Sequence, residues 1–231
     1  MPRYAVPYRA GLFFAFRYEV GYALAIRFRK VLVAVRVVIP RIAIANTKKE
    51  EIMNQALVLI DIQNDYFPDG AMELVDSLPA LANARRLLEH FRKKGRPVYH
   101  IQHLSTRPDA TFFIPDTPGA DIHQDLKPLQ DETVVTKNRP NGFFQTNLLE
   151  LLRNAGITDL AVAGMMTHMC IDTTVRAARD LGFATTLYGD ACATRDLTFD
   201  RTTVRARDVQ VAYLAALSGM FATVAKTDSL G

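Results

Sequence analysis

The stretch DLAVAGMMTHMCIDTTVRAARDLG, residues 159–182, decides how the rest of the chain is interpreted. Its apolar run from Leu160 to Ala163 is typical of a buried strand. Apolar residues then recur every three positions up to Leu181, which predicts a helix over residues 171–181. Cys170 therefore lies where a buried strand passes into a helix.

A cysteine in this position is a candidate nucleophile. The free N–H groups and the positive dipole end of a helix stabilise a thiolate, which lowers a cysteine pKa from about 8.5 to roughly 3.5–7.5. The alternative is a buried, inert cysteine that packs as a small apolar side chain. Position alone does not decide between the two, so Cys170 needs partners elsewhere in the chain.

Length and composition predict a single domain in a reducing compartment. The chain has 231 residues, enough for a sizeable core, and its two cysteines cannot form a disulfide framework. Arginines interrupt every apolar run before it reaches the roughly 18 residues that span a bilayer. We expect a cytoplasmic protein with no membrane partner.

The net charge of +4 is unevenly distributed. Residues 1–52 contain ten Lys or Arg and three Glu, whereas the remainder contains 18 basic and 21 acidic residues. The body of the protein is therefore slightly acidic and has no basic stripe, so nucleic acid is not an expected partner.

Residues 1–52 form an N-terminal extension that is rich in Arg, Tyr and Val, and residues 53–231 form the predicted domain. The extension has no Ser, unlike a transit peptide, and lacks the uninterrupted core of a signal peptide. A basic amphipathic membrane-surface segment is a second interpretation. We favour a third, in which translation starts at Met53 and Lys49-Glu50 reflects an upstream ribosome-binding sequence.

The regular part of the chain alternates short apolar runs with amphipathic segments. We expect strands at residues 56–60, 96–102, 133–136, 160–163, 184–188 and 222–225, and helices at 79–94, 147–155, 171–181 and 202–218. This alternation indicates βαβ units, hence a three-layer αβα Rossmann-like sandwich with a mostly parallel sheet of about six strands. The irregular segment from Ser105 to Pro128 either covers a site or is a surface excursion.

Polar residues stand at the ends of three of these strands, namely Asp61, Lys137 and Cys170. Parallel sheets bind ligands outside the carboxyl ends of their strands. A thiolate that attacks an amide needs a base for its proton, donors for the oxyanion and an acid for the leaving nitrogen. Asp61 suits the proton transfers and Lys137 can orient the carboxylate, although each residue alone is more often a turn former or a solvated charge.

Three segments carry a resemblance to a known superfamily. They are LIDIQNDYF at residues 59–67, TKNRPNGFF at 136–144 and GMMTHMCIDTTVRAA at 164–178. In this order and spacing they resemble the isochorismatase-like cysteine hydrolases, which include nicotinamidase, N-carbamoylsarcosine amidohydrolase, and the ureidoacrylate and biuret hydrolases. The resemblance extends from about Ala56 to about Thr227 and leaves out residues 1–52.

The resemblance implies roles for individual residues. Asp61, Lys137 and Cys170 match the catalytic aspartate, lysine and nucleophile, and the nucleophile forms a thioester as an amine or ammonia leaves. It also implies a cis peptide between Met165 and Met166, with the N–H groups of Met166 and Cys170 as the oxyanion hole. Family members are commonly oligomers, so a homodimer or homotetramer is expected.

Departures from the family pattern argue against a metal cofactor. Nicotinamidases hold a metal with an Asp-x-His pair after the second strand, where this chain has Gln102 and Leu104. His100 and His103 are three apart on a strand and face opposite ways. We therefore expect no metal and no other cofactor, and nicotinamidase activity is not expected.

The expected substrate is a small non-peptide amide of the carbamoyl or ureido type. Candidate substrate-binding residues are Tyr66, Phe67, Gln102, His103 and Phe143, and the aromatic ones would stack on a flat amide. His168 and Cys192 are interpreted as structural. Two alternatives stay open: an isochorismatase-type hydrolase of a vinyl ether, which needs no cysteine, and a non-catalytic redox-sensing or ligand-binding protein that uses Cys170 with Cys192 as resolving partner.

Overall fold

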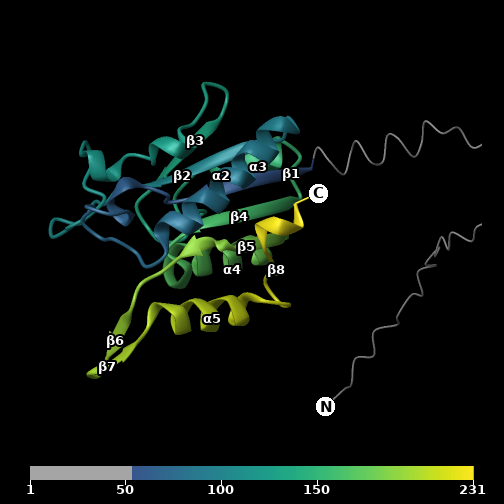
Figure 1. Cartoon of the computed structure of the whole chain (residues 1–231). Helices are drawn as coiled ribbons and strands as arrows, with labels where there is room; N and C mark the ends of the chain where they lie inside the picture. Colours follow the sequence, from purple (N-terminus) through teal and green to yellow (C-terminus); the bar gives the residue numbers. More distant parts are fainter. Residues whose placement is uncertain (1–53, 231) are drawn as a thin grey trace, which may run out of the picture. The chain divides into compact units, whose positions relative to one another are not determined.

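A computed structural model describes residues 54–230, so the predictions for residues 1–52 lie outside the described residues. Its main sheet has six strands in the order β3-β2-β1-β4-β5-β8 (Figure 1). All neighbouring pairs are parallel, which confirms the predicted sheet. The strands are β1 Gln55–Ile60, β2 Val98–His103, β3 Thr133–Lys137, β4 Asp159–Met165, β5 Ala184–Ala193 and β8 Thr223–Ala225.

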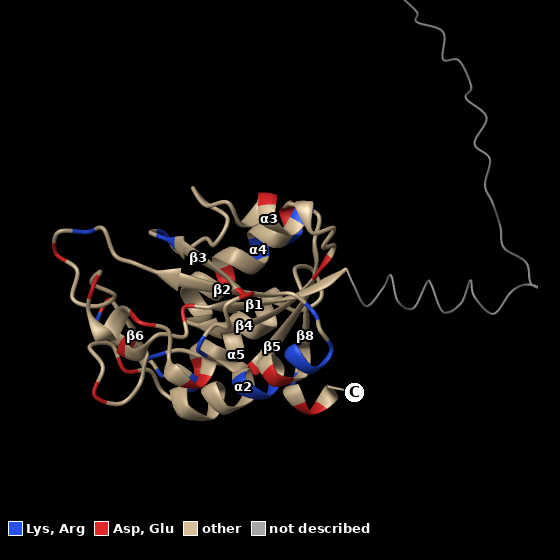
Figure 2. Ribbon diagram, turned by 90° about the horizontal axis from the view of Figure 1, so that it is seen from above, with Lys and Arg blue, Asp and Glu red and all other residues tan. Residues whose placement is uncertain are grey.

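Helices cover both faces of this sheet. In β1, Leu57 and Leu59 pack into one apolar cluster with α2, whereas Val58 and Ile60 pack into the other with α3 and α4. Figure 2 shows α2 on one side of the sheet and α3 and α4 on the other, so the three-layer prediction is confirmed. Because both faces of β1 are buried, its sequence is continuously apolar instead of alternating. The α-helices are α2 Ser77–Lys93, α3 Leu148–Asn154, α4 Asp172–Asp180 and α5 Ala206–Leu217. Helix α5 contacts β8 and α4.

Short helical turns fill the connections. Three of them belong to the segments that follow β1 and β2, one carries Cys170 and one lies near the C-terminal end. They are η1 Asn64–Tyr66, η2 Pro118–Ala120, η3 Gln124–Leu126, the π-helical turn η4 Thr167–Ile171, and η5 Thr227–Ser229. Within residues 54–230, no helix is long and apolar enough to cross a membrane.

Two predicted elements differ from the structure. The fifth strand was predicted to end at residue 188, but β5 continues to Ala193. Its pairing with β4 is interrupted over residues 188–191 and resumes at Cys192. The helix predicted from Thr202 begins only at Ala206. Instead, β7 Thr202–Val204 pairs with β6 Leu197–Phe199 in a separate antiparallel hairpin, as β-branched residues favour.

A close backbone approach joins the two central strands just before the site. Gly164 in β4 is the register partner of Ile60 in β1 and has a φ of 140°. A Cβ at this position would lie 2.0 Å from the Ile60 carbonyl oxygen. Only glycine therefore lets β4 lie against β1 next to Asp61.

We predict that Gly164→Ala destabilises the protein far more than Gly95→Ala. Gly95 also has a positive φ, 62°, but an added Cβ there meets nothing within 4 Å. Gly95→Ala should cost about 1 kcal/mol for the backbone conformation, whereas Gly164→Ala adds a clash with backbone and should cost roughly 3 kcal/mol or more. Denaturant unfolding measures both, and equal losses would show that the strands can separate freely at Gly164.

Candidate active site

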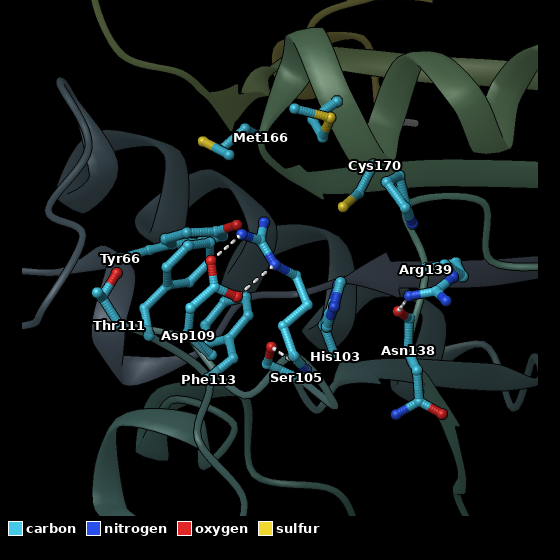
Figure 3. Close-up of a pocket in the computed structure, with 15 residues that line it drawn as sticks. Tyr66, His103, Ser105, Asp109, Thr111, Phe113, Asn138, Arg139, Met166 and Cys170 are labelled. Carbon is cyan, nitrogen blue, oxygen red and sulfur yellow. Dashed lines mark hydrogen bonds and ion pairs between the residues drawn. The ribbon is translucent and has the colours of Figure 1, made fainter.

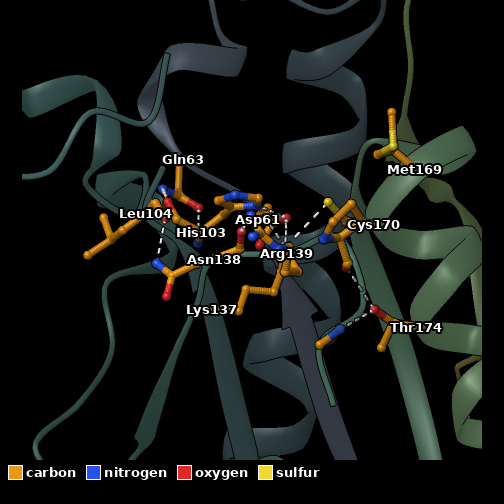
Figure 4. Close-up of polar contacts among 12 residues, drawn as sticks. Asp61, Gln63, His103, Leu104, Lys137, Asn138, Arg139, Met169, Cys170 and Thr174 are labelled. Carbon is orange, nitrogen blue, oxygen red and sulfur yellow. Dashed lines mark hydrogen bonds and ion pairs between the residues drawn. The ribbon is translucent and has the colours of Figure 1, made fainter. Parts of the chain in front are cut away.

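Four neighbouring strands each deliver one polar side chain to the same edge of the sheet. Asp61 follows β1, His103 ends β2, Lys137 ends β3, and Cys170 lies in the turn η4 that follows β4. Parallel strands end at the same edge, so residues from 61 to 170 meet there although they are distant in sequence. Figure 4 shows this convergence.

The Lys137 ammonium is the centre of the cluster. Its Nζ atom lies 2.6 Å from Asp61 Oδ2, 3.0 Å from His103 Nδ1 and 3.3 Å from Cys170 Sγ. The side chains of Lys137 and Asp61 are fully buried. The structure thus brings together the three residues predicted from their strand ends, and it adds His103, which the sequence suggested as a substrate-binding residue and not as part of this cluster.

The charges in this cluster are mutually dependent. Burial lowers the pKa of Lys137, but the Asp61 carboxylate and Cys170 outweigh burial, so its pKa is raised and it remains an ammonium. Burial, and then the Lys137 charge, lower the pKa of His103 to about 4. His103 is therefore neutral at pH 7, and its Nδ1 atom accepts the hydrogen bond from Lys137.

Cys170 corrects one expectation from the sequence. Its pKa is not lowered but raised, first by burial and then by the Asp61 carboxylate, while Lys137 opposes the shift. The position at the start of a helix cannot offset the removal of the sulfur from water, because only 2% of the residue is exposed. The resting thiol is protonated and needs a base, and the buried Asp61 Oδ1 atom has no hydrogen-bond partner among the described residues.

The backbone around Cys170 has the features that the resemblance implied. The Met165–Met166 peptide is cis. Asp61 has a φ of 52°, in the left-handed region that non-glycine residues rarely adopt. The assignment of the Met166 and Cys170 N–H groups to an oxyanion hole stays a prediction.

A cavity of about 340 Å³ opens onto the Cys170 thiol (Figure 3). Its walls come from four parts of the chain: the turn η1 after β1, the end of β2 with the segment that follows it, the residues after Lys137, and the turn around Cys170. The long segment predicted either to cover a site or to be a surface excursion therefore lines the site. The lining residues are Tyr66, His103, Ser105, Arg107, Asp109, Ala110, Thr111, Phe112, Phe113, Asn138, Arg139, Pro140, Met166, Met169 and Cys170.

Three of the five predicted substrate-binding residues lie away from this cavity. Phe67 packs against the His123 ring with centroids 4.5 Å apart, and Phe143 stacks on Phe183. The Gln102 amide donates to the Ala120 carbonyl, 3.0 Å away. Their side chains hold neighbouring segments in place, which residue type alone does not reveal, and only the other two, Tyr66 and His103, line the cavity.

Two positioning residues were missed, Gln63 and Asp65. Gln63 bonds both the N–H and the carbonyl of His103, each at 2.8 Å. Asp65 accepts the Phe113 N–H at 2.6 Å and so ties the cavity wall to the segment after β1. Both lie inside the sequence LIDIQNDYF. Only 0% of Gln63 and 7% of Asp65 are exposed, and this burial, which identifies them as positioning residues, cannot be seen in the sequence.

The donor set does not fit a metal ion. Ligand atoms of Asp61, His103 and Cys170 lie within 4.8 Å of one another, close enough for coordination. Lys137 Nζ, however, lies within 3.3 Å of all three atoms and already supplies a positive charge there. The other histidine of the pair, His100, faces away and bonds Glu132 at 2.9 Å, as its strand spacing predicted.

The second cysteine and the histidine beside Cys170 have structural surroundings. Cys192 is buried, its pKa is raised to about 12 mainly by burial, and its thiol contacts the Tyr188 carbonyl. His168 shares a 2.5 Å hydrogen bond with Thr194, and its ring lies against Tyr213. Both cysteines are free.

Comparison with known proteins agrees with this geometry. The family model for the isochorismatase domain matches residues 55–229. An uncharacterized isochorismatase family protein of Bacillus subtilis, YddQ, is 48% identical over 77% of this chain and 98% of its own. A candidate isochorismatase hydrolase from Oleispira antarctica has a crystal structure that is 43% identical, with a TM-score of 0.75 over 77% of this chain and 96% of its own. Streptothricin hydrolase of Streptomyces noursei is 37% identical over 62% of this chain and 51% of its own.

The match thus spans the parallel sheet, the four strand ends and the segment that lines the cavity. The family model and YddQ each match about three quarters of this chain. The chain is a member of the isochorismatase family of hydrolases.

Proposed function

We propose that the protein is a metal-independent cysteine hydrolase that cleaves a C–N bond in a small non-peptide amide, through a thioester on Cys170. The observation that carries the proposal is the set of contacts from one buried ammonium, Lys137, to Asp61, His103 and the Cys170 thiol. The thiol in turn faces the cavity. The catalytic residues of the proposal are Asp61, Lys137 and Cys170.

Acylation begins with the transfer of the thiol proton to Asp61, whose Oδ1 atom is free to accept it. Cys170 Sγ attacks the amide carbonyl carbon, and the oxygen becomes an oxyanion held by the N–H groups of Met166 and Cys170. Asp61 then gives the proton to the nitrogen, the C–N bond breaks, and ammonia or an amine leaves. Lys137 stabilises first the carboxylate and then the thiolate.

Hydrolysis of the thioester reuses the same groups. A water molecule loses its proton to Asp61 and attacks the thioester carbonyl. The C–S bond breaks, and the thiolate recovers a proton from Asp61. The free acid leaves and the enzyme returns to its starting state.

The cavity supports a flat, small substrate of the carbamoyl or ureido type. Its volume is about 340 Å³, at the lower end of the range for small-molecule sites. Tyr66, Phe112 and Phe113 form a cluster of rings on one wall, with centroids 4.6 to 6.0 Å apart. The similarity to streptothricin hydrolase also supports a hydrolase activity.

The alternatives have weaker support. A redox sensor needs an accessible thiol with a low pKa, whereas both cysteines are buried with raised pKa values. A vinyl-ether hydrolase gives no role to a thiol that contacts a buried lysine. Two free cysteines also support the cytoplasmic location that composition predicts.

We expect ammonia or amine release from at least one member of a panel of ureido, carbamoyl and simple amides that includes nicotinamide. Release should be unchanged by a chelator, because Lys137 supplies the positive charge of the site. A coupled ammonia assay on the full chain measures this. Activity that disappears with chelator would exclude the metal-independent mechanism.

Cys170→Ala should abolish turnover, by roughly 10⁴-fold or more, since the covalent route is lost. The matched control is Cys192→Ala, which removes the other buried thiol and should leave activity within about threefold, because it lies outside the cavity. Thermal melting of both variants checks the fold. Retained turnover in Cys170→Ala, above all on a vinyl ether, would favour the alternative hydrolase.

The rate of Cys170 alkylation should change in opposite directions when the charge of Asp61 or that of Lys137 is removed. Asp61→Asn removes a negative charge and should lower the thiol pKa, so iodoacetamide reacts faster at pH 7; Lys137→Gln should raise the pKa and slow the reaction. Each change should be roughly tenfold, the effect of one pKa unit, while turnover falls in both variants. Peptide mass spectrometry separates Cys170 from Cys192, and changes in the same direction would contradict the assigned charges.

A further inference from the structure

The β6–β7 hairpin is an arm that the body of the protein does not support. Residues 196–205, called the arm below, form a sheet of their own that is separate from the six-stranded sheet. Figure 1 shows β6 and β7 extending away from the other elements. Five of the six strand residues are exposed, and Phe199 is 87% exposed. A two-stranded hairpin of this length is at best marginally stable in water by itself.

The turn at the tip adds to the cost of this conformation. Asp200 and Arg201 connect the strands with φ values of 45° and 63°. A two-residue turn with two positive φ values favours Asn, Asp or Gly at its first position and Gly at its second, so Asp200 suits the turn and Arg201 does not. The arm is nevertheless anchored firmly at its base, where Asp196 bonds Arg205 at 2.8 Å and the Ala206 N–H at 2.7 Å.

The same chain carries a groove of about 460 Å³ between the start of α2 and the start of α5. Val75, Pro79, Ala80 and Val211 give it apolar walls, and Val75 and Val211 are 48% and 62% exposed. The groove begins at Ala206, directly after the arm. Because the arm is held at its base and points outward, its own tip does not reach this groove.

Charges at the tip and at the groove are complementary. Asp200 and Arg201 are the tip residues, and Asp76 and Arg207 line the groove. None of these four residues forms an ion pair with another described residue. Each surface therefore offers one acid and one base around an apolar centre.

We propose that the arm of one copy of this chain docks in the α2–α5 groove of a second copy, in a two-fold dimer. Phe199 enters the groove, and the charges of the tip meet those of Asp76 and Arg207. A two-fold contact is reciprocal, so the projecting part and its receptor must both face the same partner, and surfaces that lie close together on each subunit can do so. The arm and the groove are consecutive in the chain, which satisfies this requirement.

The test is complementation between two variants of the full chain, followed by sedimentation velocity and light scattering. Phe199→Asp damages the arm but keeps the groove, and Val211→Asp damages the groove but keeps the arm. Each alone should dissociate to monomers, with dimer affinity reduced roughly hundredfold or more, since both copies of the contact are lost. A mixture of the two should recover a heterodimer through one intact arm and one intact groove.

The control is Leu129→Asp, which places a charge on a residue of similar exposure, 51%, before β3. It should leave the dimer intact, and thermal melting should show all three variants folded because each site is exposed. A monomeric wild-type chain would overturn the proposal. So would a dimer that survives Val211→Asp, or a mixture that stays monomeric, because either result separates the arm from the groove.

Discussion

The buried contact between Lys137 Nζ and Asp61 Oδ2 is the interaction on which the site depends. A lone charge in this position would be strongly destabilised, and breaking a buried pair costs several kcal/mol. The pair is therefore stable only when β1 and β3 keep their register with β2 between them. Sheet geometry and site electrostatics constrain each other, because the strands position the charges and the charges need one another.

Much of the architecture could be predicted from short-range patterns. The continuous apolar runs of β1 and β4 indicated strands buried on both faces, and their alternation with helices indicated a parallel sheet. Once the sheet is parallel, residues 61, 137 and 170 must lie at one edge, because each follows or ends a strand. The convergence of Asp61, Lys137 and Cys170 is thus a consequence of topology and needs no knowledge of side-chain contacts.

What could not be predicted depends on burial and on which side a residue faces. The thiol pKa was expected to follow the helix dipole, but the dipole term is small beside the removal of sulfur from water. Phe67 and Phe143 have the residue type of a substrate wall, yet Phe67 is buried against His123 and the half-buried Phe143 stacks on Phe183. The helix predicted from Thr202 begins only at Ala206, because residues 202–204 pair with β6 and this pairing cannot be seen in the sequence.

The wall of the cavity is attached separately from the catalytic groups. The Ser105 N–H bonds the Phe113 carbonyl at 2.8 Å, and Asp65 holds the Phe113 N–H, so residues 106–112 form a loop with a fixed stem. The four polar side chains of the cluster all lie on other segments. The loop is therefore a modular insert: its sequence and length can diversify, in evolution or in a loop-exchange library, while the stem keeps the reaction centre unchanged.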